Sequence, residues 1–469
     1  MEMLMFNIDK SKDQPIYIQL YEKIKENIIN NTIREGEKLP SKRQLSHHLS
    51  LSQTTIENAY GLLIDEGFII SKPKSGYYVS DIESLPVVVS HQSQNHISSE
   101  VHHKHVELPK YTFQLGAVDK AHFPFEQFRK YAKEAFEDLQ YDLIESGHIQ
   151  GDYHLRAQIS QYLFHSRGVQ STPDQVIIAS STDQLLSIIT DILPETCSFI
   201  LEDPIYRQVR QVLKRKHINH DFLPITHDGI DTQNINQWRH EVVYITPSHQ
   251  FPTGVTMRLK KRIQLLKWAS THQDRFIIED DYDSEFRYEG KPIPALQSLD
   301  QTGSVIYIST FSKSISPTIR IAYAVLPERL MTRYRQKTNI EGGTVPRHTQ
   351  FIVSRFMESY QFERHLNRMR KIYRKKRDVL LNHLKRYPHI FQISGEATGM
   401  HFVIQIVNGL TESECLERFR YYDIQIRPIS QYLFKYTYDK PTFVLGFGGI
   451  PIEELEEHIN QLIQSLNTN

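Results

Sequence analysis

Apolar residues near the start of the chain recur about once per helical turn from Ile16 to Ile28, which predicts a helix with one apolar face. Two shorter periodic segments follow, and each begins at a serine suited to cap a helix, Ser41 and Ser52. Residues 68–79 then hold two short runs of aromatic and β-branched residues on either side of a turn, which predicts a two-stranded hairpin. This order of elements predicts a winged helix-turn-helix fold.

The pattern changes between residues 176 and 326, where short continuous apolar runs alternate with segments of helical periodicity. This alternation predicts an α/β fold with a mainly parallel sheet and crossover helices. A smaller α+β part is expected from about residue 350 to the end. Residues 81–110 lose all periodicity and are rich in Ser, Gln and His, so we predict a flexible linker between a domain at 1–80 and a domain at 111–469.

The two capped helices have the spacing of a helix-turn-helix, whose second helix enters the major groove of DNA by its N-terminal end. Residues 38–56 carry basic side chains and no carboxylate, although residues 1–80 hold as many acidic as basic residues. We therefore predict binding to operator DNA, with base contacts from the start of the second helix and phosphate contacts from the basic residues. The predicted DNA-binding residues are Lys42, Arg43, Ser52, Gln53, Thr54, Thr55, Lys72 and Lys74. The alternative is a small helical domain with no role in DNA binding.

The apolar run at residues 306–308 is followed by the hydroxyls of Thr310 and Ser312, then by Lys313 and, further on, by Arg320. A lysine amine forms a Schiff base with an aldehyde, and hydroxyl groups with a guanidinium hold a phosphate. The pattern therefore fits a phosphorylated aldehyde that is held covalently. Taken alone, a lysine at the end of a strand is more often solvated.

Another apolar run, at residues 276–278, ends in three acidic residues, of which Asp280 is the second, and in Tyr282. A carboxylate here can keep a pyridine nitrogen protonated, and a tyrosine hydroxyl can bind the phenolic oxygen of the same ring. By themselves these carboxylates could also be metal ligands or loop charge. Their combination with Lys313 favours a cofactor site.

Residues 14–80 resemble the winged helix-turn-helix domain of GntR-type bacterial regulators, through LPSKRQL at residues 39–45 and AYGLLIDEG at residues 59–67. Residues 111–465 resemble the fold-type I aminotransferases, a family built around pyridoxal 5'-phosphate. The whole chain is similar to the MocR/GabR subfamily of regulators, in which these two domains are fused. This resemblance implies a head-to-tail homodimer.

The resemblance also assigns roles in cofactor binding. Lys313 would form the Schiff base, Asp280 would pair with the pyridinium nitrogen and Tyr282 with the phenolic oxygen. Tyr206 would stack on the ring, and Arg320 would hold the phosphate with nearby hydroxyls and the start of a helix. The cofactor-binding residues that the resemblance implies are Lys313, Asp280, Tyr282, Tyr206, Arg320, Ser312, Thr310, Ser181 and Thr182.

Two positions depart from working aminotransferases of this fold. Phe443 stands at the approach to a late strand expected at residues 444–447, where an arginine usually pairs with the substrate carboxylate. Phe251 stands where an asparagine commonly contacts the ring oxygen. The candidates to contact an effector in place of the missing arginine are Arg427, Arg207, Arg210 and His249.

Three classes of function remain open: a regulator that uses the cofactor or its Schiff base with an amine as a signal, an aminotransferase with an accessory DNA-binding domain, and a DNA-binding protein with a dimerisation scaffold. The cofactor residues disfavour the scaffold, and the missing arginine disfavours the enzyme. We predict a regulator that senses pyridoxal 5'-phosphate itself or an amine or amino acid. One subgroup of the resembled regulators responds to γ-aminobutyrate. A PdxR-like subgroup responds to pyridoxal phosphate and controls vitamin B6 synthesis, and the missing arginine tilts the prediction toward it.

The 469 residues have a formal net charge of +0 at pH 7, and no apolar run approaches the length that crosses a membrane. The first ten residues lack the order of a signal peptide. Cys197 and Cys415 are far apart and fit a reducing compartment. We therefore expect a cytoplasmic protein without a membrane partner. The histidines of the linker have no accompanying cysteine, so we expect no metal site there.

Overall fold

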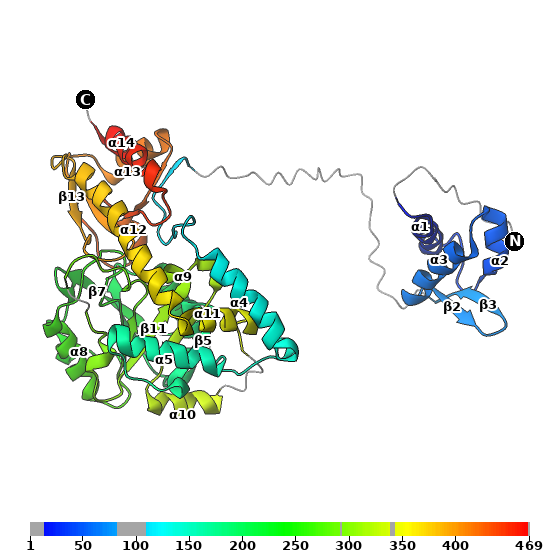
Figure 1. Cartoon of the computed structure of the whole chain (residues 1–469), viewed down its shortest axis with the longest axis horizontal. Helices are drawn as coiled ribbons and strands as arrows, with labels where there is room; N and C mark the ends of the chain where they lie inside the picture. The colour runs from blue at the N-terminus through cyan, green and yellow to red at the C-terminus, as the bar shows by residue number, and fades with distance from the viewer. Residues whose placement is uncertain (1–13, 82–108, 291–292, 338–342, 468–469) are drawn as a thin grey trace. The chain divides into compact units, whose positions relative to one another are not determined.

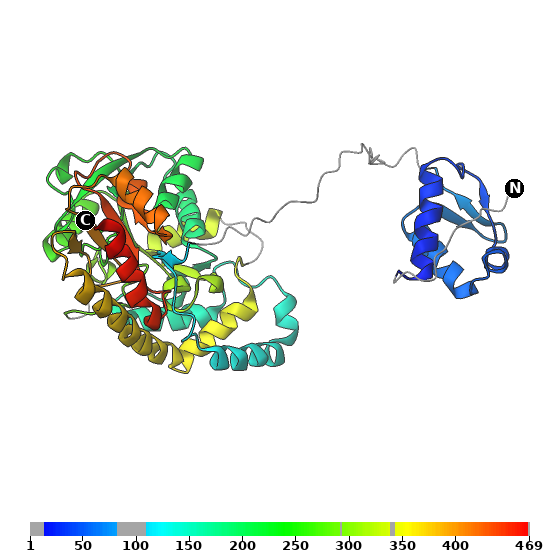
Figure 2. The same cartoon turned by 90° about the horizontal axis from the view of Figure 1, so that it is seen from above.

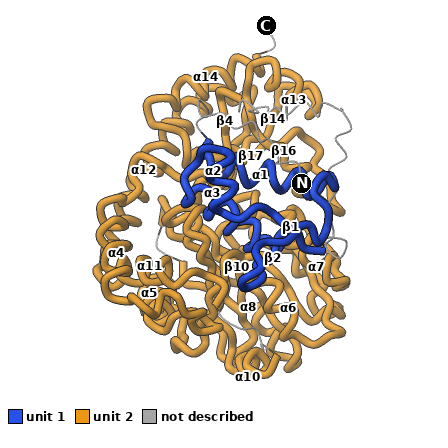
Figure 3. Tube along the Cα trace, turned by 90° about the vertical axis from the view of Figure 1, so that its right-hand side faces the viewer, with its two compact units in different colours: residues 1–105 blue, residues 106–469 orange. Residues whose placement is uncertain are grey.

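The computed structural model describes residues 14–81, 109–290, 293–337 and 343–467. The chain divides into two compact units, residues 1–105 and 106–469, which Figure 3 shows in different colours. Each unit is described by itself. Most of the predicted linker, with its histidines, lies outside the described residues.

Residues 14–81, the described part of the first unit, form three helices, α1 (Ile16–Ile29), α2 (Lys42–Leu49) and α3 (Gln53–Asp65). Both predicted caps are present, because the Ser41 side chain accepts from the Gln44 backbone amide and the Ser52 side chain from that of Thr55. Gln44 also binds back to the Ser41 backbone amide, which completes a capping box. The apolar faces of the three helices meet in one core, which includes Leu20, Ile24, Ile28, Leu45, Ile56 and Leu63.

The predicted hairpin is formed by β2 (Ile69–Lys72) and β3 (Gly76–Val79), which pair in antiparallel fashion. The sheet has a third strand, β1 (Lys38–Leu39), which pairs with the other side of β3. The prediction of two strands was therefore incomplete. A strand of two residues is too short to show an alternating pattern, so β1 could not be predicted from the sequence.

The second unit is built on an eight-stranded sheet (Figure 1). Its strands are, in spatial order, β5 (Val176–Ala179), β12 (Ala322–Val325), β11 (Val305–Thr310), β10 (Phe276–Asp280), β9 (Val242–Ile245), β6 (Phe199–Asp203), β7 (His220–Thr226) and β8 (Gly229–Ile230). The five strands from β11 to β7 run parallel, while β12, β5 and β8 join in antiparallel fashion. The predicted mainly parallel sheet is thus confirmed. Because parallel strands end at the same edge, Asp280 and Thr310 reach that edge side by side.

Helices cover both faces of this sheet, as its continuous apolar strands require. Ile277 belongs to an apolar cluster with Trp268 of α8, whereas the next residue, Ile278, belongs to a cluster with Leu185 of α6. The helices of this part are α4 (Phe125–Asp138), α5 (Tyr153–Arg167), α6 (Thr182–Ile192), α7 (Arg207–Arg215), α8 (Leu259–Ser270), α9 (Phe311–Ser314), α10 (Glu328–Lys337) and α11 (Arg347–Glu358).

A smaller antiparallel sheet follows toward the C-terminus, with its strands in the order β13 (Phe391–Ser394), β14 (His401–Ile406), β17 (Thr442–Gly446) and β16 (Arg427–Pro428). The accompanying helices are α12 (Gln361–Leu384), α13 (Glu412–Tyr421) and α14 (Leu455–Leu466), and α14 packs against α12 (Figure 2). The short strands β4 (Tyr111–Thr112) and β15 (Ile424–Gln425) pair separately.

The late strand β17 begins two residues earlier than expected, so Phe443 lies inside it, fully buried, and not at its approach. Among the described helices of both units, none is long and apolar enough to cross a membrane.

Candidate functional site

Every residue that was predicted to bind the cofactor lines one cavity of about 510 Å³. These residues come from the ends of β10 and β11, from the starts of α6 and α7, and from the segment before β12. The candidate site therefore lies at the carboxyl edge of the parallel strands, where α/β sheets usually bind ligands. The chain segments that meet there are far apart in sequence.

Lys313 lies in the short helix α9, directly after β11, and is half-buried. Burial lowers the pKa of its amine, and the nearby Asp283 carboxylate opposes this effect. A lowered pKa leaves more of the amine in the neutral, nucleophilic form. Gly116 makes room for the amine, because a Cβ atom at this position would lie 1.8 Å from Lys313 Nζ.

Asp280 ends β10 and presents its two carboxylate oxygens differently. The Tyr244 hydroxyl donates a hydrogen bond to Oδ2, whereas Oδ1 is buried and has no hydrogen-bond partner among the described residues. Burial raises the pKa of this carboxyl to about 7, and the hydrogen bond from Tyr244 acts against that shift. A protonated ring nitrogen would supply both the missing hydrogen bond and a countercharge. Asp280 therefore fits the pyridine ring of pyridoxal phosphate.

A second group of residues that line the cavity is suited to an anion. Ser181 caps α6, its side chain accepting from the Gln184 backbone amide at 3.2 Å, and Thr182 is the first residue of the helix. Arg320 lines the same cavity, close enough for its charge to act on Asp183 of α6, and has a left-handed backbone conformation with φ 53°. Thr310 caps α9 and donates to the Ser312 hydroxyl at 2.9 Å. A helix N-terminus, hydroxyls and a guanidinium together favour a phosphate.

Aromatic rings form another part of the cavity wall. Tyr206 precedes α7 and is 44% exposed, as a ring that lies on the wall of an open cavity would be. The Phe251 ring meets Tyr206 edge-on, at a centroid distance of 5.4 Å, and also meets Tyr282 and Tyr432. Phe251 has no polar atom in its side chain, so this position offers the ring oxygen of a cofactor no hydrogen bond.

The effector candidates separate into two groups. Arg207, the first residue of α7, and Arg427, in β16, both line the cavity. Arg427 pairs in register with Val444 of β17, so its guanidinium comes from the strand beside the one that lacks the expected arginine.

Arg210 and His249 do not line the cavity. The Arg210 guanidinium lies over the Phe434 ring, 4.5 Å from its centroid, and also near the Phe222 ring, so it packs on aromatic side chains outside the cavity. His249 is buried behind Tyr282, and its Nδ1 lies 3.0 Å from the Tyr282 hydroxyl. Neither residue is placed to contact an effector in the cavity directly.

Several lining residues were not foreseen from the sequence, namely Leu115, Gly116, Asp183, Tyr244, His401 and Tyr432. Tyr244 lies on β9 opposite Ile278 of β10, so the strand pairing that brings its hydroxyl to Asp280 could only be known from the fold. Asp183 follows Thr182, and the start of α6 was the available clue to it.

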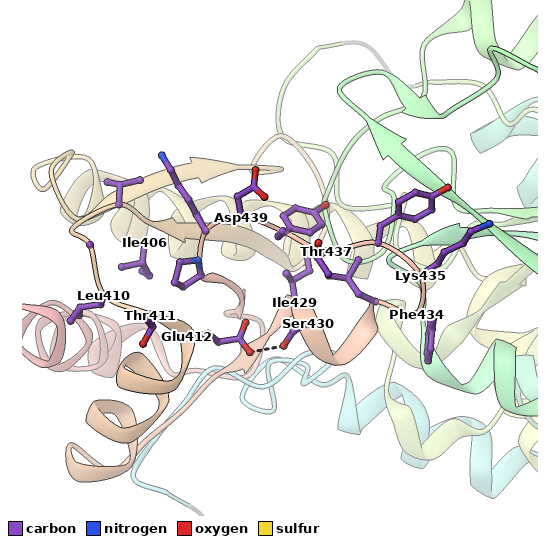
Figure 4. A pocket seen from close by; sticks show the side chains of 17 residues that line it. Ile406, Leu410, Thr411, Glu412, Ile429, Ser430, Phe434, Lys435, Thr437 and Asp439 are labelled. Atoms are coloured by element: carbon purple, nitrogen blue, oxygen red, sulfur yellow. Dashed lines mark hydrogen bonds between the residues drawn. The ribbon is translucent and has the colours of Figure 1, made fainter.

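A larger hollow of about 770 Å³ lies between residues 406 and 441 (Figure 4). Its walls include Glu412, which accepts a hydrogen bond of 2.6 Å from the Ser430 hydroxyl. None of the residues predicted to bind DNA, cofactor or effector lines it. Size alone therefore does not identify the site, and the chemistry of the smaller cavity does.

The predicted DNA-contacting residues come from the starts of α2 and α3 and from the hairpin of β2 and β3. Gln53 and Thr54 are exposed in the first turn of α3, and Thr55 is half-buried there. Ser52 is occupied in capping α3 through the Thr55 amide. Arg43, Lys72 and Lys74 are exposed.

Lys42, one of the basic residues predicted to contact DNA, forms an ion pair with Glu57 of α3. The Glu57 hydrogen bond raises the pKa of Lys42. Lys42 can bind a phosphate only in competition with this partner.

Comparison with known proteins is consistent with both halves of this geometry. Residues 16–79 match the family model described as bacterial regulatory proteins, gntR family, and residues 113–459 match aminotransferase class I and II. The Pyrococcus horikoshii kynurenine aminotransferase structure superposes with a TM-score of 0.69, covering 77% of this chain and 91% of that chain at 24% identity. A winged helix-turn-helix joined to an aminotransferase fold defines the class: DNA-binding regulators with an enzyme-like second domain.

Relatives that span nearly the whole chain agree. The uncharacterized HTH-type transcriptional regulator YdeL of Bacillus subtilis is 38% identical over 97% of both chains. The probable rhizopine catabolism regulatory protein MocR of Rhizobium meliloti is 28% identical over 98% of this chain and 95% of its own. The pyridoxine biosynthesis regulator PdxR of Corynebacterium glutamicum is 27% identical over 82% of each. The chain belongs to the MocR/GabR subfamily of GntR-type transcriptional regulators.

Proposed function

We propose that this protein is a transcriptional regulator that holds pyridoxal 5'-phosphate as a Schiff base on Lys313 and changes its affinity for operator DNA with the state of that site. The observation that carries the proposal is the unpartnered Oδ1 of Asp280 in the cavity that also contains the Lys313 amine. A buried carboxylate oxygen without a donor is costly, so a protein that keeps one has use for a protonated ligand.

In this proposal the cofactor supplies an aldehyde and an electron-withdrawing ring, and the chain supplies the environment. Asp280 holds the ring nitrogen protonated and Tyr206 covers the ring. Arg320 and the start of α6 bind the phosphate. Lys313 provides the covalent attachment.

The effector class is proposed from the two arginines in the cavity. A guanidinium pairs both oxygens of a carboxylate, so Arg427 and Arg207 favour an amino acid as a signal in addition to the cofactor itself. The preference for sensing the cofactor alone rested on a missing arginine, and the position of Arg427 removes that reason. The same arginine keeps an active aminotransferase as the second candidate, which keto-acid formation from an amino acid with bound cofactor would reveal.

Two further parts of the proposal concern the assembly. We expect a homodimer in a head-to-tail arrangement, because an operator with two half-sites is read by a two-fold symmetric pair of recognition helices. We expect the protein to act in the cytoplasm, where operator DNA is found.

The test is a visible absorption spectrum of the full-length protein with added pyridoxal phosphate, beside Lys313→Ala. We expect a visible band in the wild type that the variant lacks. Lys260→Ala is the matched control, because Lys260 is exposed in the first turn of α8, and this variant should keep the band. A wild type without any band would show that the cavity has lost its cofactor, and the large domain would then be a scaffold.

A further inference from the structure

Phe251 offers no hydrogen bond to the phenolic oxygen of a bound cofactor, and the proposed function assigns that oxygen to the Tyr282 hydroxyl. The Phe251 ring packs edge-on against Tyr282, with centroids 6.0 Å apart, and gives it no hydrogen bond. The direction in which the Tyr282 hydroxyl donates its hydrogen therefore affects the cofactor more than it would if an asparagine at position 251 donated a second hydrogen bond. The residues behind Tyr282 determine this.

The Tyr282 hydroxyl contacts the buried His249, which in turn contacts the Asp283 carboxylate. His249 Nδ1 lies 3.0 Å from the Tyr282 hydroxyl and 2.9 and 3.0 Å from the two oxygens of Asp283. His249 is 1% exposed and Asp283 is 2% exposed. A single ring nitrogen thus faces both a carboxylate and a phenol, away from water.

This contact determines which atom carries which hydrogen. An ionised carboxylate only accepts, so the nitrogen that faces Asp283 must carry the ring hydrogen. The Tyr282 oxygen contacts the same N–H group and accepts from it. Its own hydrogen is then free to point into the cavity, and burial raises the pKa of Tyr282, so the hydroxyl keeps that hydrogen.

The backbone of the loop before β14 is packed tightly against this pair. A Cβ atom on Gly399 would lie 2.1 Å from His249 Cε1 and 2.6 Å from Asp283 Oδ2, and the residue has a φ of +76°. On another side, the His401 ring lies at a centroid distance of 4.6 Å from that of His249. The imidazole is therefore confined between Gly399, His401 and Asp283, and has little freedom to turn.

We propose that Asp283 and His249 form a positioning pair that commits Tyr282 to donate its hydrogen to the phenolic oxygen of pyridoxal phosphate, in the place of the amide that Phe251 removes. This inference rests on the proposed function, because it requires the cofactor in the cavity. His249 acts through Tyr282 and does not itself touch the ligand.

The charged surroundings decide which residue to change. His249 faces Asp283, Tyr282 and His401, and Tyr282 lies in the field of Asp280, Asp281, Asp283 and Glu202. Asp283 also raises the pKa of Lys313, so its removal would alter the lysine directly. Substitutions of His249 avoid that second effect.

The experiment is a pH titration of the visible band of the full-length protein with added pyridoxal phosphate. The form present at high pH carries more negative charge near the phenolic oxygen, so a hydrogen bond donated there lowers the midpoint. Removing His249 should weaken that bond and raise the midpoint by about half to one pH unit, as the loss of one hydrogen bond implies. EDTA is present throughout, because His249, Asp283 and His401 offer ligand atoms within 4.8 Å of one another.

Three variants of His249 separate positioning from packing. His249→Phe and His249→Gln should both raise the midpoint, since neither places a donor at the position of Nδ1. His249→Asn should return it close to the wild-type value, because its amide nitrogen reaches about as far as Nδ1. His458→Gln is the matched control, a buried histidine on α14 whose Nδ1 contacts the Glu454 carbonyl, and should leave the midpoint unchanged.

A double substitution shows whether His249 acts through Tyr282. Tyr282→Phe alone should raise the midpoint at least as far as His249→Phe, and the two together should go no further. A wild-type midpoint in His249→Phe and His249→Gln overturns the inference, and so does a full additional shift in the Tyr282→Phe background. A wild type with no band overturns the proposed function instead, and this inference with it.

Discussion

The surroundings of Asp280 indicate which kind of ligand fits the site. Its Oδ2 accepts from Tyr244, its Oδ1 has no partner among the described residues, and burial raises the pKa of the carboxyl to about 7. A carboxyl whose folded pKa exceeds its unfolded value near 3.8 destabilises the unloaded protein once the pH rises above that unfolded value. The penalty is complete above about pH 7. A cationic ring nitrogen would remove it.

We therefore predict that Asp280→Asn stabilises the protein without cofactor in a pH-dependent way. Its melting temperature should equal that of the wild type near pH 4 and should exceed it by an increasing amount up to about pH 7. For a pKa shift of this size, the gain in unfolding free energy reaches about 4 kcal/mol. Calorimetry across this pH range measures the gap. Added pyridoxal phosphate should stabilise the wild type more than the variant.

Tyr244→Phe provides a control of opposite sign. The Tyr244 hydroxyl lowers the pKa of Asp280, so its loss should enlarge the penalty at pH 7 and lower the melting temperature further there than near pH 4. A gap between Asp280→Asn and the wild type that does not change with pH would contradict the assignment.

At the scale of elements, the stability of the winged helix-turn-helix depends on helix caps that can be predicted from the sequence. The capping box at Ser41 satisfies two backbone amides at the start of α2, and the loss of such a cap costs about 1 kcal/mol. Ser41→Ala should speed amide exchange in α2 about fivefold in the full-length protein, the factor that corresponds to this energy. Hydrogen exchange read by mass spectrometry measures it. Ser71→Ala, exposed in β2, should leave α2 unchanged, and equal protection in both variants would remove the cap from the account.

The elements that carry long apolar runs or caps could be predicted, and those fixed by tertiary pairing could not. The runs before Asp280 and Thr310 became β10 and β11 because a strand buried on both faces needs continuous apolar residues. Strand β1 escaped notice because two residues show no pattern. The predicted start of β17 is wrong because the strand is buried on both faces, so its residues do not alternate between apolar and polar in a way that marks where it begins.

The candidate site divides in the same way. Residues in sequence motifs, such as Lys313 and Asp280, were named in advance, and the structure gathers them into one cavity. The positions of Tyr244, His401 and Arg427 in the site depend on which strands pair with each other, and the sequence does not show this pairing. The prediction for Arg210 is wrong because its guanidinium packs over the ring of Phe434, a contact between distant parts of the sequence.

At the scale of the whole molecule, the central claim is that the state of the cavity changes DNA binding. A ligand shifts a conformational equilibrium only as far as its affinities for the two states differ. Couplings between sites in proteins are typically about 1–3 kcal/mol, which corresponds to a change in affinity of about 5- to 150-fold. Only the intact chain contains both units, so the coupling is measured there.

The most direct test is the dissociation constant for an operator fragment, selected from random DNA by the wild-type protein, with and without pyridoxal phosphate. Fluorescence anisotropy at fixed salt concentration gives the value for the wild type and for Lys313→Ala. We predict that the cofactor changes the wild-type constant at least about fivefold and leaves that of the variant unchanged. An equal response in both proteins, or no response in a wild type whose visible band shows the cofactor bound, would contradict the account.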